Sequence, residues 1–289
     1  MTTKFLGSFL AFASLSAAAV RSDMLVSSDW LTQHLTDSKL VILHVSANRA
    51  VYDAGHIPGA RFVALSELVV NRDGIPNEVP AIADLKKVLE AAGVSDDSRV
   101  IIYGDTSVLP ATRAYFTLDY LGHGDQAALL DGGLAKWRKE NRPVTTDVPH
   151  FAATTYAGKR RAAMAVDVNY VASNLGKAVL IDARSPQRYR GESEPIDPVA
   201  GRIPGALNRN NGDNLSAAGV FKQPDELKKD FLAILGSRPA SDVVNYCGSG
   251  VSAAHNALAM EVAGLPGSRL YAGSWSEWIA DPGRPREKG

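Results

Sequence analysis

The stretch Asp242-Val-Val-Asn-Tyr-Cys-Gly-Ser-Gly-Val-Ser-Ala-Ala-His-Asn-Ala-Leu-Ala-Met260 decides how the whole sequence is interpreted. An apolar run ends at Cys247, and glycines follow at positions 248 and 250. Apolar residues then recur at helical spacing from Val251 to Val262. The pattern predicts a strand, a tight loop and a helix.

Cys247 is the only cysteine of the chain, and this turn makes it a candidate nucleophile. Its sulfur would lie at the mouth of a loop whose backbone N–H groups converge beside a helix N-terminus. Anions are stabilised in such a place and thiol pKa values fall there. The alternative is a buried structural thiol, because free cysteine is among the most buried residue types. Gly248 and Gly250 favour the functional interpretation.

Composition excludes several classes of protein. A chain of 289 residues with 45% hydrophobic content is globular and long enough for about two domains. Its formal net charge of zero gives no indication of a nucleic-acid partner. One cysteine rules out an internal disulfide and zinc sites built from cysteine pairs, and the six histidines show no metal-binding spacing. We therefore expect neither a metal nor a cofactor.

Residues 1–23 have the pattern of a signal peptide. Lys4 precedes an apolar run over residues 5–20, and Ala17-Ala18-Ala19 offers a cleavage site. The run is short for a membrane span, so we expect export to the periplasm or the medium and no membrane partner. The alternative is a cytoplasmic protein that starts at Met24.

From Met24 onward the chain has an α/β pattern. Strands alternate with helices, which predicts a mostly parallel sheet covered on both faces. Ser28 or Asp29 is the expected cap of the first helix. The expected strands are residues 39–45, 99–103 and 127–130, and the expected helices are residues 30–35, 82–92, 112–121 and 134–140.

The second part of the chain repeats the first. Gly55-His-Ile-Pro-Gly-Ala60 returns as Gly201-Arg-Ile-Pro-Gly-Ala206, and Asp131-Gly-Gly-Leu-Ala-Lys-Trp137 returns as Ala272-Gly-Ser-Trp-Ser-Glu-Trp278. Between these blocks, residues 100–104 return as residues 243–247. Conserved order and spacing predict two copies of one domain, at residues 24–142 and 164–289, joined by a surface linker at residues 143–163.

These residues carry a resemblance to a known family. Two α/β repeats, each with a Gly-His-Ile-Pro-Gly-Ala-like block, and a cysteine in the second repeat alone resemble the tandem-domain sulfurtransferases of the rhodanese family. The resemblance covers nearly all of residues 24–278. The loop Cys247-Gly-Ser-Gly-Val-Ser252 is more similar to the Cys-Gly-Ser-Gly-Val-Thr of 3-mercaptopyruvate sulfurtransferases than to the Cys-Arg-Lys-Gly-Val-Thr of thiosulfate enzymes.

The resemblance implies a persulfide mechanism. Cys247 would take sulfane sulfur from a small anionic donor, 3-mercaptopyruvate or thiosulfate. It would pass that sulfur to cyanide or to a thiol, including that of a thioredoxin-like protein. The loop residues Gly248, Gly250, Val251 and Ser252 would bind the donor through their N–H groups. The first repeat has Gly104 where the second has Cys247, so it could form no persulfide.

Further site residues follow from the same resemblance. Arg188 matches the family's donor-binding arginine, with a surface or interdomain ion pair as the alternative, whereas Arg184 is expected to pair structurally with Glu194 or another carboxylate. Ser249 matches a serine that is proposed to help move a proton onto the pyruvate enolate, with a turn-forming role as the alternative. His56 would face the interdomain cleft.

One departure from the subfamily pattern and two other classes of function bear on this assignment. The mercaptopyruvate subfamily has a second arginine directly after Glu-Pro, where this chain has Ile196, so thiosulfate stays open as the main donor. His255 is expected to serve a helix face and not catalysis. A cysteine phosphatase would need an arginine six residues after the cysteine, where this chain has Ala253. A docking module without catalysis is the remaining alternative.

Overall fold

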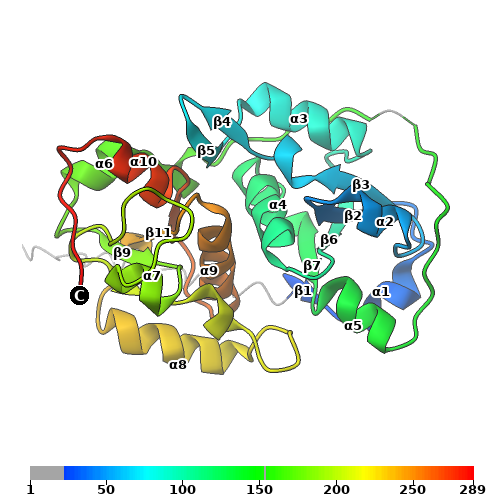
Figure 1. Cartoon of the computed structure of the whole chain (residues 1–289). Helices are drawn as coiled ribbons and strands as arrows, with labels where there is room; N and C mark the ends of the chain where they lie inside the picture. Colours follow the sequence, from blue (N-terminus) through cyan, green and yellow to red (C-terminus); the bar gives the residue numbers. More distant parts are fainter. Residues whose placement is uncertain (1–22, 153) are drawn as a thin grey trace, which may run out of the picture.

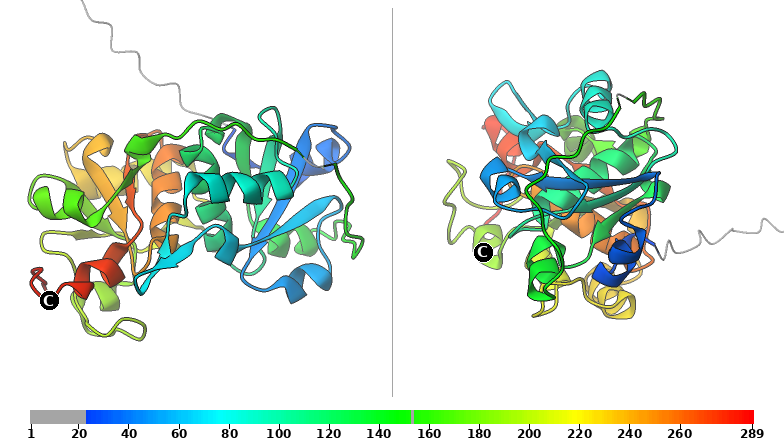
Figure 2. Two further views of the ribbon diagram at one scale, coloured as in Figure 1. Left: turned by 90° about the horizontal axis from the view of Figure 1, so that it is seen from above. Right: turned by 90° about the vertical axis from the view of Figure 1, so that its right-hand side faces the viewer.

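The computed structural model describes residues 23–152 and 154–289. Figures 1 and 2 show two α/β halves side by side, a first half of residues 23–142 and a second half of residues 164–289. No helix within the described residues is long and apolar enough to cross a membrane. The predicted signal segment lies outside the described residues, except for Asp23.

The first half is built on a parallel sheet with the strand order β1-β7-β6-β2-β3. A separate antiparallel hairpin projects from it. The elements of this half are β1 (Leu25–Val26), α1 (Ser28–His34), β2 (Leu40–Ser46), α2 (Arg49–Asp53), β3 (Ala60–Ala64), β4 (Val70–Arg72), β5 (Ile75–Glu78), α3 (Ile82–Ala91), β6 (Arg99–Tyr103), α4 (Leu109–Tyr120), β7 (Ala127–Leu130) and α5 (Gly133–Lys139).

The second half repeats this plan with the strand order β10-β9-β11-β12-β8, again parallel throughout. Its elements are β8 (Ala165–Val166), α6 (Val168–Ser173), β9 (Val179–Asp182), α7 (Pro186–Arg190), β10 (Leu207–Asn208), α8 (Pro224–Leu235), β11 (Val243–Tyr246), α9 (Val251–Val262), β12 (Arg269–Tyr271) and α10 (Ser274–Ala280).

Apolar side chains cover both faces of each sheet. In β6, Val100 and Ile102 pack into one apolar cluster, whereas Ile101 and Tyr103 pack into another with Trp137. The alternation follows from the two-residue period of a strand. It confirms the predicted α/β class with a parallel sheet buried on both faces.

The predicted strands and helices of the first half are present, whereas β1, α2 and β3 were not predicted. Ser27, and neither Ser28 nor Asp29, caps α1, because its side chain accepts a hydrogen bond from the N–H of Trp30 at 3.1 Å. Helix α4 begins earlier than predicted, with Pro110 in its first turn. The β4–β5 hairpin was not anticipated; Asp73 and Gly74 form its turn with positive φ angles of 52° and 83°.

Matched contacts confirm the repeat. The Tyr52 hydroxyl donates to the carbonyl of Ala60 at 2.9 Å, and the Tyr189 hydroxyl donates to that of Ala206 at 2.6 Å. Gly55 and Gly201, which open the repeated blocks, have φ angles of 141° and 129°. The two halves therefore share backbone conformation and side-chain contacts.

The described parts of the linker, residues 143–152 and 154–163, follow the outside of the first half in Figure 1. Thr145 forms an isolated bridge with His56, and a 3-10 turn (Ala162–Met164) ends the segment. One residue departs from a purely superficial course, because the Tyr156 ring is buried and its hydroxyl donates to the carbonyl of Leu121 at 3.2 Å. The domain limits inferred from the sequence stay a prediction.

The two halves meet through α4 and α9, which lie side by side at the centre of Figure 1. Every residue of α4 from Ala111 to Tyr120 is buried, because the helix packs against its own sheet on one side and against α9 on the other. A helix enclosed in this way has no polar face. Its one arginine, Arg113, is therefore enclosed at the interface.

Candidate active site

The predicted strand, loop and helix are present as β11, a loop of residues 247–250 that we call the Cys247 loop, and α9. Cys247 is 2% exposed. Gly250 has a φ of 73°, and a Cβ atom there would lie 2.4 Å from the carbonyl oxygen of Ala272. Only glycine fits this position, so Gly250 shapes the loop and does not itself line the cleft.

Backbone N–H groups of α10 donate hydrogen bonds to carbonyl groups of the Cys247 loop. Trp275 N donates to the carbonyl of Cys247 at 3.0 Å, and Ser276 N donates to that of Gly248 at 2.9 Å. The N–H groups of residues 248–253 donate to no residue in the described part of the chain. They remain free to bind an anion beside the N-terminus of α9.

A guanidinium from the first half also contacts the Cys247 loop. Arg113 is fully buried, and it donates to the carbonyls of Gly250 and Asn77, both at 3.0 Å. It forms no ion pair with a carboxylate among the described residues. Burial lowers the pKa of Arg113 to about 10, while the negative charge of an ionised Cys247 acts in the opposite direction. Its hydrogen bond to Gly250 places this positive charge against the loop that carries Cys247.

Cys247 lies in a cleft of about 720 Å³ between the halves, within the range of small-molecule sites. Gly248, Ser249, Val251 and Ser252, which the sequence analysis names as candidate site residues, line it. The opposite wall is residues 73–77 of the β4–β5 hairpin. From that wall, the Asn77 side-chain amide donates to the Ser249 hydroxyl at 2.8 Å.

Arg188 lies beside the Cys247 loop and lines the same cleft. Its Nη2 donates to Glu194 Oε1 at 2.6 Å and to Asp197 Oδ2 at 3.1 Å, and its Nε donates to Glu194 Oε2 at 3.1 Å. Its Nη1 has no partner in the described part of the chain. The structure therefore shows the ion-paired alternative for Arg188, and donor binding by this side chain stays a prediction.

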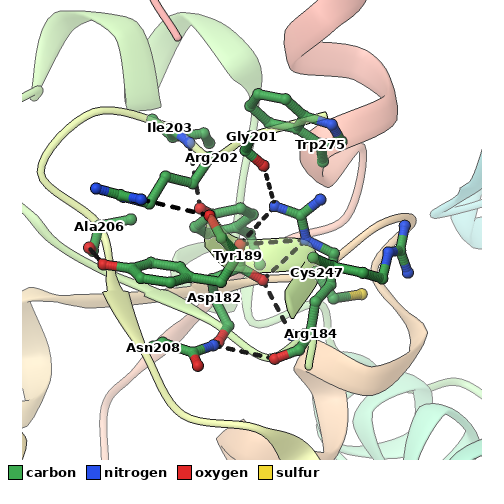
Figure 3. A network of polar contacts seen from close by, with 12 residues as sticks. Asp182, Arg184, Tyr189, Gly201, Arg202, Ile203, Ala206, Asn208, Cys247 and Trp275 are labelled. Atoms are coloured by element: carbon green, nitrogen blue, oxygen red, sulfur yellow. Dashed lines mark hydrogen bonds and ion pairs between the residues drawn. The ribbon is translucent and has the colours of Figure 1, made fainter. Parts of the chain in front are cut away.

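Arg184 forms the structural pair that the sequence predicted. Figure 3 shows its guanidinium between Asp182 and the carbonyl of Gly201, next to Cys247. The distances are 2.6 Å from Nη2 to Asp182 Oδ2 and 2.7 Å to Gly201 O, and Nη1 lies 3.0 Å from Glu194 Oε2. Burial alone would lower the pKa of Arg184, but Asp182 raises it above its ordinary value.

His56 and His255 do not line the cleft that contains Cys247. The structure contradicts the expectation that His56 faces the cleft, because its ring is buried against Tyr52 and its nitrogens contact the carbonyls of Tyr52 and Asp147 at 2.9 and 3.1 Å. His56 is absent from the cleft lining. His255 lies on a buried face of α9 near Phe221, as expected for a helix-face role.

Sequence reasoning missed the partners that come from distant segments: Asn77, Arg113, Asp197 and Ser276. No local motif marks Asn77, Asp197 or Ser276. A signal did exist for Arg113, because it is the only Lys or Arg in the otherwise mostly apolar helix at residues 109–120. A lone cation in a helix that is buried on all sides needs a specific partner.

Comparisons with known proteins agree with this geometry. A family model described as the rhodanese-like domain matches residues 27–140 and 167–281. A Pseudomonas aeruginosa protein, named a probable 3-mercaptopyruvate sulfurtransferase, is 40% identical over 91% of this chain and 98% of its own. The sulfur carrier protein TtuD of Thermus thermophilus is 35% identical over 92% and 97%. The wild-type structure of EanB has a TM-score of 0.81 at 24% identity over 92% of this chain and 69% of its own, which shows the fold.

Replacing Arg113 should separate its charge from its hydrogen bonds. We expect Arg113→Leu to slow alkylation of Cys247 by iodoacetamide by about tenfold or more, because the neighbouring cation is lost. It should also lower the melting temperature, since each unpaired buried carbonyl costs about 1–3 kcal/mol. Arg113→Lys keeps the charge and should retain more of the alkylation rate. An unchanged alkylation rate in Arg113→Leu, matching that of the exposed-site control Arg160→Leu, would contradict the electrostatic role.

Acid stability should depend on His255. Burial lowers its pKa from 6.5 to about 3. The unfolded chain therefore binds a proton below pH 6.5 that folded His255 does not take up, and stability falls as the pH falls from 6.5 toward 3. His255→Leu should reduce this slope by up to about 1.4 kcal/mol per pH unit in denaturant unfolding between pH 7 and 4.5. The exposed-site control His150→Leu should leave the slope unchanged, and an equal slope in both variants would refute the linkage.

Proposed function

The chain belongs to the rhodanese family and is a sulfurtransferase, and from that premise we propose that it carries sulfane sulfur as a persulfide on Cys247. The observation that supports this most is the placement of the lone thiol in a cleft, beside N–H groups without internal partners and the buried Arg113 guanidinium. The Cys247 thiolate would attack the sulfur of the donor. A new S–S bond forms as the bond from that sulfur to the rest of the donor breaks. The remainder of the donor, without its sulfur, leaves as an anion.

In this proposal 3-mercaptopyruvate is the main donor, and thiosulfate is the alternative. Gly248 and Ser249 place no positive side chain in the loop, so a doubly charged anion would have only the backbone amides, Arg188 and the buried Arg113 guanidinium. Mercaptopyruvate brings one carboxylate, which the free Nη1 group of Arg188 can bind. The Ser249 hydroxyl accepts a hydrogen bond from Asn77, so its own proton is available for the pyruvate enolate.

The remaining assignments are proposals from the sequence. The acceptor would be cyanide or a thiol, including that of a thioredoxin-like protein. Export of the chain to the periplasm or the medium rests on residues 1–23, and a start at Met24 would leave it in the cytoplasm. We also propose that the two domains span residues 24–142 and 164–289.

Replacing Cys247 with serine tests whether sulfur transfer requires the thiol. Cys247→Ser should abolish sulfur transfer from either donor while the melting temperature stays close to that of the wild type, because a hydroxyl cannot form a persulfide. Intact-mass spectrometry should show the addition of one sulfur atom to the wild type after donor treatment, and none to the variant. Turnover that survives in Cys247→Ser would remove Cys247 from the mechanism.

The donor preference is tested by adding charge to the loop. Gly248→Arg with Ser249→Lys should shift the kcat/KM ratio toward thiosulfate by about a factor of ten, equivalent to about 1.4 kcal/mol. A Cβ at position 248 would lie 3.2 Å from Arg188 Nη2, the end of a flexible side chain that can move aside. Gly248→Arg alone keeps the bond from Asn77 to Ser249 and serves as the control. If the wild type already favours thiosulfate at equal subsaturating concentrations, loop charge does not set donor choice.

A further inference from the structure

An alternating row of five charged groups leads from the sheet of the second half to the cleft. Asp182 pairs with Arg184, Arg184 with Glu194, Glu194 with Arg188, and Arg188 with Asp197. The four N···O distances lie between 2.6 and 3.1 Å. Three carboxylates face two guanidiniums, so the row carries one excess negative charge. The member that reaches the cleft at its end is Asp197.

The lining of the cleft has the same excess. Its charged residues within the described chain are Arg188, Asp197 and Asp73. Asp73 lies in the turn of the β4–β5 hairpin, on the opposite wall, and forms no ion pair with any described residue. Arg188 already forms ion pairs with Glu194 and Asp197. Its positive charge is therefore largely balanced, and Arg188 does not act on Cys247 as a free cation would.

Asp197 is fixed beside Gly248, the residue that follows Cys247. Its Oδ1 lies 2.6 Å from the Ser276 hydroxyl, and its Oδ2 lies 3.6 Å from the position of a Cβ on Gly248. Its side chain is 6% exposed. A carboxylate held in such a poorly solvated wall acts on a nearby charge more strongly than one in water does.

The second half of the proposed reaction is the step most sensitive to this field. An acceptor thiolate attacks the outer sulfur of Cys247–S–SH. A new S–S bond forms as the bond between that sulfur and Cys247 Sγ breaks, so that Cys247 leaves as a thiolate and the acceptor becomes a persulfide. No oxidant is needed, but a negative nucleophile must enter a cleft with excess negative charge.

We propose that the acceptor is an aminothiol, in which a positively charged amino group lies against Asp197 while the thiolate attacks the persulfide. The ammonium offsets the excess charge of the lining, and Asp73 on the opposite wall adds to the attraction. A neutral thiol gains nothing from these carboxylates and an anionic thiol is repelled. This inference rests on the proposed persulfide function and adds the charge class of its second substrate.

The test uses three small thiols of similar length that differ in charge. The full chain is first loaded with 3-mercaptopyruvate, and the added sulfur atom is confirmed by intact mass. Cysteamine, 2-mercaptoethanol and thioglycolate then discharge it in single-turnover experiments, with rates expressed per thiolate. Cysteamine should be about tenfold faster than 2-mercaptoethanol, and thioglycolate should be the slowest. The advantage of cysteamine should shrink as salt is raised.

Asp197→Asn keeps the size of the side chain and removes its charge, so it should reduce the advantage of cysteamine severalfold. Glu192→Gln is the matched control, because Glu192 is exposed and pairs only with Arg190 in the described chain, and it should preserve the order. If no persulfide forms, the proposed function itself fails. If the persulfide forms but the three wild-type rates do not follow charge, or if the advantage of cysteamine is undiminished in Asp197→Asn, this inference alone is overturned. The wild-type order and its salt dependence decide the matter even if Asp197→Asn fails to fold.

Discussion

The buried guanidinium of Arg113 joins the two halves at the point where the chemistry is proposed to occur. It is rooted in the first half and donates to the carbonyl of Gly250 in the Cys247 loop and to that of Asn77 in the hairpin. Burying a cation without a carboxylate partner is costly, so an ionised sulfur nearby offsets part of that cost. The first half, which has no thiol, thus contributes a hydrogen bond and a buried positive charge to the Cys247 loop.

The first half shows what happens to the same loop once the thiol is gone. Leu134 N donates to the carbonyl of Gly104 at 3.0 Å, just as Trp275 N donates to that of Cys247. The next residue, Asp105, turns its carboxylate back onto Thr106 N and accepts from Ser46 Oγ at 2.6 Å. Burial raises the pKa of Asp105, yet these bonds outweigh it and lower the pKa below its ordinary value. An internal carboxylate thus occupies N–H groups of the kind that stay free around Cys247.

Local patterns were enough to predict the fold and the strand, loop and helix that carry Cys247, because periodicity, glycine placement and internal repetition are properties of short segments. They predicted β6 and β7 at their observed bounds and the pairing of Arg184 with Glu194. They could not predict contacts between distant segments, such as those from Asn77 to Ser249 and from Arg113 to Gly250. The expectation for His56 was wrong because the linker, through the carbonyl of Asp147, covers the face where a cleft was expected.

The presence of Ile196 in place of arginine, directly before Asp197, changes the charge balance of the cleft. A second arginine after Glu-Pro would have balanced the charge of the cleft, whereas this chain has an exposed isoleucine followed by Asp197. In the proposed cycle the donor and the acceptor then bind groups of opposite charge in one wall of the cleft. The donor carboxylate takes the unpaired Nη1 group of Arg188, and the acceptor ammonium takes the carboxylate that shares Nη2. Because the guanidinium and Asp197 touch, a bound donor anion weakens their pairing, and its departure restores the negative field that attracts the acceptor. Charge alternation in one wall can thereby order the two steps without any movement of the domains.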